Sequence, residues 1–140
     1  MTNLPPSADP DLPEAEEKQP QKSFIFPPVF FIFVKIPFDA ALVARREEGI
    51  SRIDQSLQDK RLGSVLGWGN SVGAARRDGT RAIEFYRIDI EVTDLALGRA
   101  VLRQTLAALG APPGTEIHYK MEERNLQDIY RLSGWVLEQS

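Results

Sequence analysis

The chain has 140 residues and no cysteine, and its 17 basic and 20 acidic residues give a formal net charge of −3 at pH 7. This length predicts a single domain, and the lack of cysteine excludes a disulfide framework and thiol chemistry. The most apolar run, residues 24–36, is shorter than the roughly 20 residues that a membrane-spanning helix needs, which argues against a membrane protein.

Residues 1–22 differ in composition from the rest of the chain. They hold five of the ten prolines, no aromatic residue, and five acidic against two basic residues. Such a segment cannot bury enough apolar surface to offset the entropy lost on ordering. We therefore predict a disordered, acidic, Pro-rich tail at residues 1–22 and one α+β domain at residues 23–140. The N-terminus also lacks the pattern of a secretory signal, so we expect a cytoplasmic protein.

The first half of the domain predicts a strand, a helix and a second strand. Residues 29–36 are β-branched and aromatic, which predicts the first strand. Asp39 is a suitable helix cap, and apolar residues recur at three- and four-residue spacing over residues 40–61, which predicts an amphipathic helix. A glycine-loosened strand is predicted over residues 64–73, and the Asp-Gly pair at 78–79 predicts a hairpin turn.

The second half repeats this order and adds a C-terminal segment. Residues 83–92 alternate apolar and charged side chains, a helix is predicted from Thr93 or Asp94 to Leu109, and residues 115–121 alternate again. The order β-α-β-β-α-β predicts a ferredoxin-like α+β sandwich, in which two helices cover one face of an antiparallel sheet. The extra segment predicts a short helix over residues 126–132 and an edge strand or packing arm at 135–137.

No catalytic site, metal site or cofactor is predicted. The glycine-rich segment 67–73 lacks the following helix that a phosphate-binding loop needs, and a bent strand with a bulge explains it better. His118 is the single histidine, which argues against a His-based metal site. Asp89 and Glu91 share one strand face, where Arg87 can neutralise one of them. An enzyme that uses His118 with Asp89 or Glu91 stays a third-ranked alternative.

The open face of the predicted sheet is the candidate binding surface. Phe31 and Phe33 share one face of the first strand, and aromatic side chains on an open sheet can stack on single-stranded RNA. Acidic side chains on the neighbouring strand and the net neutrality of the domain, which holds 15 basic and 15 acidic residues once the tail is removed, argue against nucleic acid. A protein-contact surface, or burial of the aromatic residues under the C-terminal arm with Trp135, fits better. The residues predicted to bind a protein partner are Phe31, Phe33, Trp68, Arg87, Asp89, Glu91 and His118.

The glycine-rich segment 63–73, the strand and helix that follow from residue 83, and the Pro-Gly turn at 112–114 together resemble small bacterial immunity proteins of ferredoxin-like fold. The resemblance covers residues 29–121 and rests on structural motifs. It implies a non-catalytic inhibitor that binds and blocks a cognate secreted toxin. The alternative is a small-molecule-sensing or regulatory domain that acts as a homodimer through its sheet edges, and the fold analogy supports both only by association.

Overall fold

The computed structural model describes residues 28–75, 77–79 and 81–140. The predicted tail at residues 1–22 lies outside the described residues. The described part of the chain forms an α+β structure with an antiparallel six-stranded sheet in the order β3-β4-β2-β5-β6-β7. Its strands are β2 (Phe30–Pro37), β3 (Gly63–Ala75), β4 (Arg81–Val92), β5 (Glu116–Met121), β6 (Arg124–Arg131) and β7 (Gly134–Gln139).

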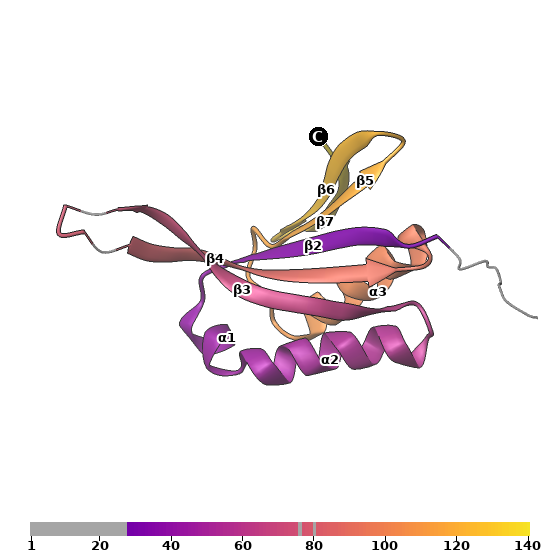
Figure 1. Cartoon of the computed structure of the whole chain (residues 1–140), viewed down its shortest axis with the longest axis horizontal. Helices are drawn as coiled ribbons and strands as arrows, with labels where there is room; N and C mark the ends of the chain where they lie inside the picture. Colours follow the sequence, from indigo (N-terminus) through magenta and orange to yellow (C-terminus); the bar gives the residue numbers. More distant parts are fainter. Residues whose placement is uncertain (1–27, 76, 80) are drawn as a thin grey trace, which may run out of the picture.

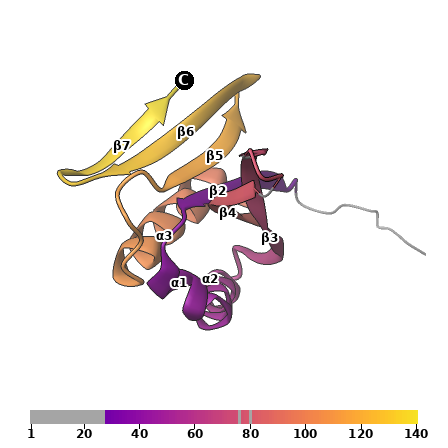
Figure 2. The ribbon, with the colours of Figure 1, turned by 90° about the vertical axis from the view of Figure 1, so that its left-hand side faces the viewer.

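Three helices connect the first four strands, and they lie on one side of the sheet (Figure 1, Figure 2). They are α1 (Ala40–Ala44), α2 (Arg46–Asp59) and α3 (Leu95–Ala108). The core lies between this helix layer and the sheet, where alternate strand residues and the inward faces of α2 and α3 are buried. No helix among the described residues is long and apolar enough to cross a membrane.

Capping side chains define where the helices begin. The Asp39 carboxylate accepts hydrogen bonds from the backbone N–H groups of Ala41 and Leu42 at 3.0 and 3.1 Å, and Asp94 accepts one from Leu97 N at 2.9 Å. These bonds satisfy N–H groups that have no partner inside the helix. The single helix predicted over residues 40–61 is instead two helices, because Arg45 leaves helical geometry while the apolar spacing continues across it.

Two glycines let backbone segments approach more closely than any other residue would. A Cβ atom at Gly98 of α3 would lie 2.8 Å from the Val92 side chain, and one at Gly63 would overlap the carbonyl of Glu91. Both contacts lie at the end of β4 that leads into α3. The missing side chains therefore fix how closely α3 and β3 pack against this end of the sheet.

The C-terminal segment departs from the prediction. The short helix expected over residues 126–132 is wrong, because Arg124–Arg131 forms strand β6 beside β5. Leu126 and Ile129 have helical spacing, but they lie on opposite faces of β6, and the inward position between them is taken by the polar residue Asp128. The edge strand expected near Trp135 is confirmed as β7, which ends the sheet.

Candidate functional site

The sheet face opposite the helices carries most of the residues predicted to bind a partner. Residues that pair across antiparallel strands lie on the same face. Phe33 of β2 pairs with Asp89 of β4 and His118 of β5, and Phe31 pairs with Glu91. Arg87 is two residues from Asp89 on β4, so the two side chains lie on the same face of the sheet. Strand register therefore brings together six of the predicted residues on what we call the open face, namely Phe31, Phe33, Arg87, Asp89, Glu91 and His118.

Phe33 is the centre of the contacts on the open face. Its ring stacks on the imidazole of His118, with the ring centroids 4.5 Å apart and an interplanar angle of 4°. The guanidinium of Arg87, on the neighbouring strand, lies 3.9 Å from the same ring centroid, and the Phe31 ring is 6.2 Å away. Cation–π and stacked-ring contacts restrict how these side chains can turn. The face thus presents aromatic surface in a fixed arrangement.

Several charged groups on the open face are paired with one another. Arg87 Nε donates to Asp89 Oδ1 at 2.7 Å, His118 Nε2 lies 2.8 Å from Glu116 Oε1, and Lys35 Nζ lies 3.9 Å from the same Glu116 oxygen. The Lys35 ammonium also lies over the ring of Phe85 at 4.2 Å. Both signs alternate across the strands, so the face has no extended region of a single charge.

The open face is accessible to a partner. The Phe31 side chain is 50% exposed, and those of Arg87 and Asp89 are 40% and 38% exposed. A groove of about 780 Å³ borders Phe31 and His118 and continues past Val29 toward Glu122 and Glu123 at the β5–β6 turn. The exposed Phe31 ring thus borders this groove.

Trp68 does not join the other predicted binding residues. It pairs with the buried Ile88 and therefore lies on the helix side of the sheet, where its ring stacks on Tyr86 at 6.1 Å and lies under the Arg46 guanidinium at 4.9 Å. The indole is 42% exposed, so it does not fill a gap in the core. The bulge predicted in this glycine-rich strand is confirmed by the register shift between Val65 and Gly67.

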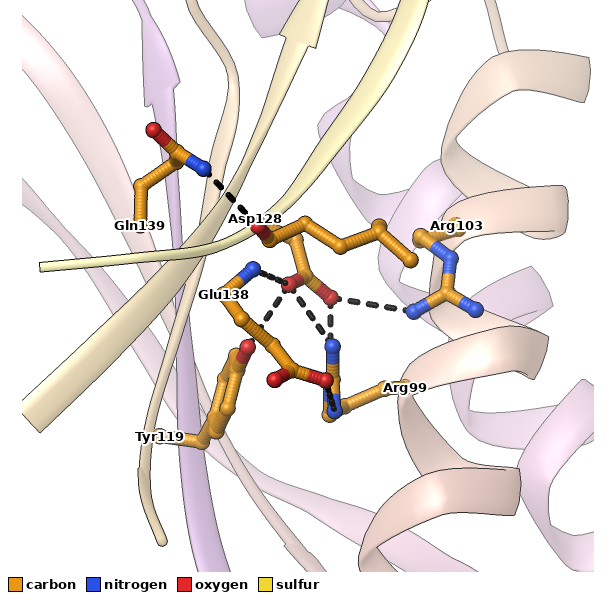
Figure 3. A network of polar contacts seen from close by, with 7 residues as sticks. Arg99, Arg103, Tyr119, Asp128, Glu138 and Gln139 are labelled. Atoms are coloured by element: carbon orange, nitrogen blue, oxygen red, sulfur yellow. Dashed lines mark hydrogen bonds and ion pairs between the residues drawn. The ribbon is translucent and has the colours of Figure 1, made fainter. Parts of the chain in front are cut away.

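A buried charge cluster under β6 is the feature that sequence reasoning missed (Figure 3). Asp128 is fully buried and accepts two hydrogen bonds from Arg99 of α3, at 2.8 and 2.9 Å. Arg103 donates to it at 3.0 Å, the Tyr119 hydroxyl at 2.7 Å and the Glu138 backbone N–H at 3.0 Å. One carboxylate thus ties α3, β5, β6 and β7 together.

The electrostatics of the cluster keep Asp128 ionised. Burial alone would raise the pKa of Asp128, but the hydrogen bonds from Arg99, from the Glu138 N–H and from Tyr119 outweigh it and hold the pKa below its ordinary value. Burial, together with the hydrogen bond to the carboxylate, raises the pKa of the Tyr119 hydroxyl well above its usual range. Burial alone would lower the pKa of the Arg99 guanidinium, but its hydrogen bonds to Asp128 outweigh burial and raise that pKa, so Arg99 is charged.

This cluster stabilises the fold and offers no access to a ligand. Asp128 has no exposed surface and only 7% of the Arg99 side chain is exposed. The backbone of Glu138 adopts a positive φ of 57°, a conformation that non-glycine residues rarely take, and its N–H there points at Asp128. Arg99 and Arg103, four residues apart on one helix face, were the signal in the sequence that could have indicated a buried acidic partner.

Two further surface hollows lie in the described part of the chain, one of about 440 Å³ along residues 43–48 and one of about 370 Å³ beside Gly67–Ser71. An apolar pocket of about 40 Å³ lies beneath α1 and α2, beside Tyr86 and Ile53. The described part of the chain contains no group of three or more His, Asp or Glu side chains placed to hold a metal ion. Comparison of the chain with models of protein families, with curated proteins and with solved structures finds no match.

Proposed function

We propose that the protein is a non-catalytic protein-binding module that uses its open sheet face. Its first four strands and their connecting helices are organised as a ferredoxin-like core, to which β6 and β7 add an extension. The order β3-β4-β2-β5, with helices between β2 and β3 and between β4 and β5, supports this assignment. The observation that supports this function is the exposed ring of Phe31 beside Phe33. Arg87 and His118 hold the Phe33 ring in place.

A folded protein is the partner class that this chemistry favours. Aromatic and arginine side chains dominate the centres of protein interfaces, whereas the rims carry mixed charges. The open face has this arrangement, because Phe33 and Arg87 are central and the carboxylates of Asp89, Glu91 and Glu116 lie around them. Carboxylates directly beside the aromatic rings disfavour a nucleic-acid backbone, which carries negative charge along its length.

The most specific form of this proposal is an immunity protein that binds and inhibits a cognate bacterial toxin. An inhibitor of this kind needs a rigid, preformed surface, because ordering side chains on binding lowers affinity. The stacked Phe33 and His118 rings and the Arg87–Asp89 ion pair limit that ordering. Together with the resemblance to immunity proteins of ferredoxin-like fold, this supports a role in blocking a partner's surface.

Rescue from toxicity tests this proposal. The test needs a secreted toxin encoded beside this gene, and a host that expresses such a toxin would be co-transformed with the full chain or with one of two variants. Phe31→Ala removes an aromatic ring that is 50% exposed on the open face, and Phe38→Ala removes one that is 48% exposed in the segment between β2 and α1. We expect the wild-type chain and Phe38→Ala to restore growth and Phe31→Ala to restore it poorly.

Equal rescue by both variants would exclude the open face as the inhibitory surface. No rescue by the wild-type chain, in a strain where the chain is soluble and folded, would exclude the toxin-inhibitor form of the proposal. Binding of the purified toxin to the three chains separates these results, because a toxin that binds without being inhibited still supports a protein-binding module.

The two alternatives have weaker support. A small-molecule sensor needs a well-formed, mostly apolar pocket of several hundred cubic ångströms. The apolar pocket beneath α1 and α2 holds only about 40 Å³, and the larger groove beside Phe31 is an open surface groove whose lining includes Lys120, Glu122 and Glu123. A catalytic pair of His118 with Asp89 or Glu91 has weaker support, because Arg87 engages Asp89 and the described contacts of the His118 ring are with Phe33 and Glu116. If His118→Ala abolished turnover of a substrate without changing stability, the enzyme alternative would replace ours.

A further inference from the structure

Strand β3 ends the sheet with an unusually unprotected segment. Register shifts interrupt its pairing with β4 between Val65 and Gly67 and again after Ser71. Between them, Gly67–Ser71 keeps a regular register, from Asp89 opposite Gly67 to Phe85 opposite Ser71. Edge strands are usually protected by lysine, proline or a bulge. This segment, Gly-Trp-Gly-Asn-Ser, contains no charged residue and no proline, and the bulges lie outside it.

The side chains of this segment leave both of its faces accessible. A Cβ atom placed at Gly67 or Gly69 would meet nothing within 4 Å, so the open-face side is flat there. On the helix side, the indole of Trp68 is 42% exposed, and Leu66 beside it is 55% exposed. Nearer the start of β3, the Val65 N–H is not available to another strand, because it donates a hydrogen bond to the Asp54 carboxylate at 2.9 Å.

The other edge of the sheet is a poor template for a further strand. β7 has six residues, and its pairing with β6 shifts register between Gln127 and Ile129. Gly134 and Glu138 both have positive φ, so the backbone bends away from a regular strand at each end. The two edges therefore differ in kind, and only β3 offers a regular row of backbone groups.

We propose that Gly67–Ser71 pairs antiparallel with the same segment of a second copy of this chain, about a two-fold axis at Gly69. In that register Gly69 faces Gly69, Gly67 faces Ser71, and Trp68 faces Asn70. No like charges meet, and small residues meet small residues on the flat face, which is the self-complementarity that an isologous contact requires. A charged peptide would find no complementary group in this segment, whereas a second copy needs none.

The resulting dimer has one continuous sheet through both copies. A two-fold axis perpendicular to the sheet places both open faces on the same side of it. The inference does not rest on the proposed function, because it uses the edge of β3 and leaves Phe31 and Phe33 uncovered. A dimer could therefore present two binding faces at once.

Sedimentation of the full chain over a range of concentrations tests this pairing. Gly69→Lys places two ammonium groups across the axis, and its Cβ has room in the monomer. We expect it to weaken dimerisation at least tenfold, because like charges directly opposite are destabilising. Leu132→Lys is the matched control, since Leu132 is 94% exposed in the β6–β7 turn and remote from β3. It should dimerise like the wild-type chain.

A crosslink locates the contact directly, because the chain contains no cysteine. Paired strand residues lie within the Cα separation that a disulfide spans. Gly69→Cys should give a covalent dimer on mild oxidation, and Leu132→Cys should not. A wild-type chain that stays monomeric at all concentrations overturns the proposal. So does a dimer that Gly69→Lys leaves unchanged, or one that crosslinks through residue 132 and not through residue 69.

Discussion

The two faces of the sheet are built by alternate residues of the same strands, yet they have opposite properties. On the helix side, Val34, Ile90 and Ile117 have no exposed surface. Their neighbours along the chain lie on the open face, where Phe33 and His118 stack on one another and Asp89 pairs with Arg87. The helix side has its contacts with other layers, whereas the open face has contacts only within its own layer.

This difference separates stability from recognition. Burial against α2 and α3 removes apolar area from water and supplies most of the folding free energy. The open face contributes little to that energy, because ion pairs between exposed side chains are worth about 0–1 kcal/mol. Substitutions on the helix side should therefore change stability, and those on the open face should change binding.

Asp128→Asn should destabilise the fold by about 3–5 kcal/mol, the usual cost of removing one partner from a buried ion pair. The Arg99 guanidinium would stay buried while its bidentate carboxylate partner is lost. Chemical denaturation measures the change. Asp89→Asn is the matched control, because it also breaks an arginine–aspartate pair, but one whose side chains are 40% and 38% exposed. Similar losses for both variants would contradict the division between the faces.

Gly98→Ala should destabilise the protein by about 1–3 kcal/mol, because an added methyl group in a closely packed layer forces its neighbours apart. The new Cβ would lie 2.8 Å from the Val92 side chain. Gly67→Ala, whose Cβ meets nothing within 4 Å, should change stability by less than about 1 kcal/mol. Thermal melting of the two variants compares them. Equal losses would show that α3 does not pack on Val92 as described.

The pH dependence of stability should contain a contribution from Asp128. Its pKa is lower in the folded protein than the value of about 3.9 expected when unfolded. The unfolded state therefore binds the proton more readily, so this stabilisation is complete above the unfolded pKa and is lost as pH falls through the folded pKa. Denaturation at a series of acidic pH values should show a fall in unfolding free energy that is smaller in Asp128→Asn. Parallel curves would contradict it.

Phe31→Ala should change the free energy of unfolding by less than about 0.5 kcal/mol, as surface substitutions usually do. The ring is 50% exposed and its nearest aromatic neighbour, Phe33, is 6.2 Å away between centroids. Denaturation under the same conditions as for Asp128→Asn gives the comparison. A loss of several kcal/mol would mean that the open face is part of the stabilising core.

The sequence predicted the parts of the fold that depend on local patterns. Alternation placed Ile88 and Ile90 inward with Asp89 outward, Asp39 was predicted as a helix cap, and the pair at 78–79 marked the hairpin turn. The same alternation identified the open face, because residues of one parity on strands that become neighbours must share a face. The candidate site could therefore be predicted as far as the order of the strands in the sheet could be predicted.

The parts that were missed depend on contacts between distant segments. Asp128 occupies an inward position of β6, where an apolar residue would have completed the alternating pattern that predicts a strand. Its partners Arg99 and Tyr119 lie 29 and 9 residues away in the sequence. Trp68 lies on the helix side because a bulge after Val65 resets the register of β3. Neither a buried ion pair nor the position of a bulge leaves a periodic pattern in one sequence.

The affinity of a purified partner for two lysine variants tests the central claim most directly. Phe31→Lys and Leu97→Lys each replace an apolar side chain, 50% and 55% exposed, on the open face and on α3 respectively. Titration calorimetry with the full chain should show that Phe31→Lys lowers the affinity for the partner at least thirtyfold, the equivalent of about 2 kcal/mol. Leu97→Lys should leave the affinity unchanged. Wild-type affinity for Phe31→Lys, with loss in Leu97→Lys, would place recognition on the helices instead.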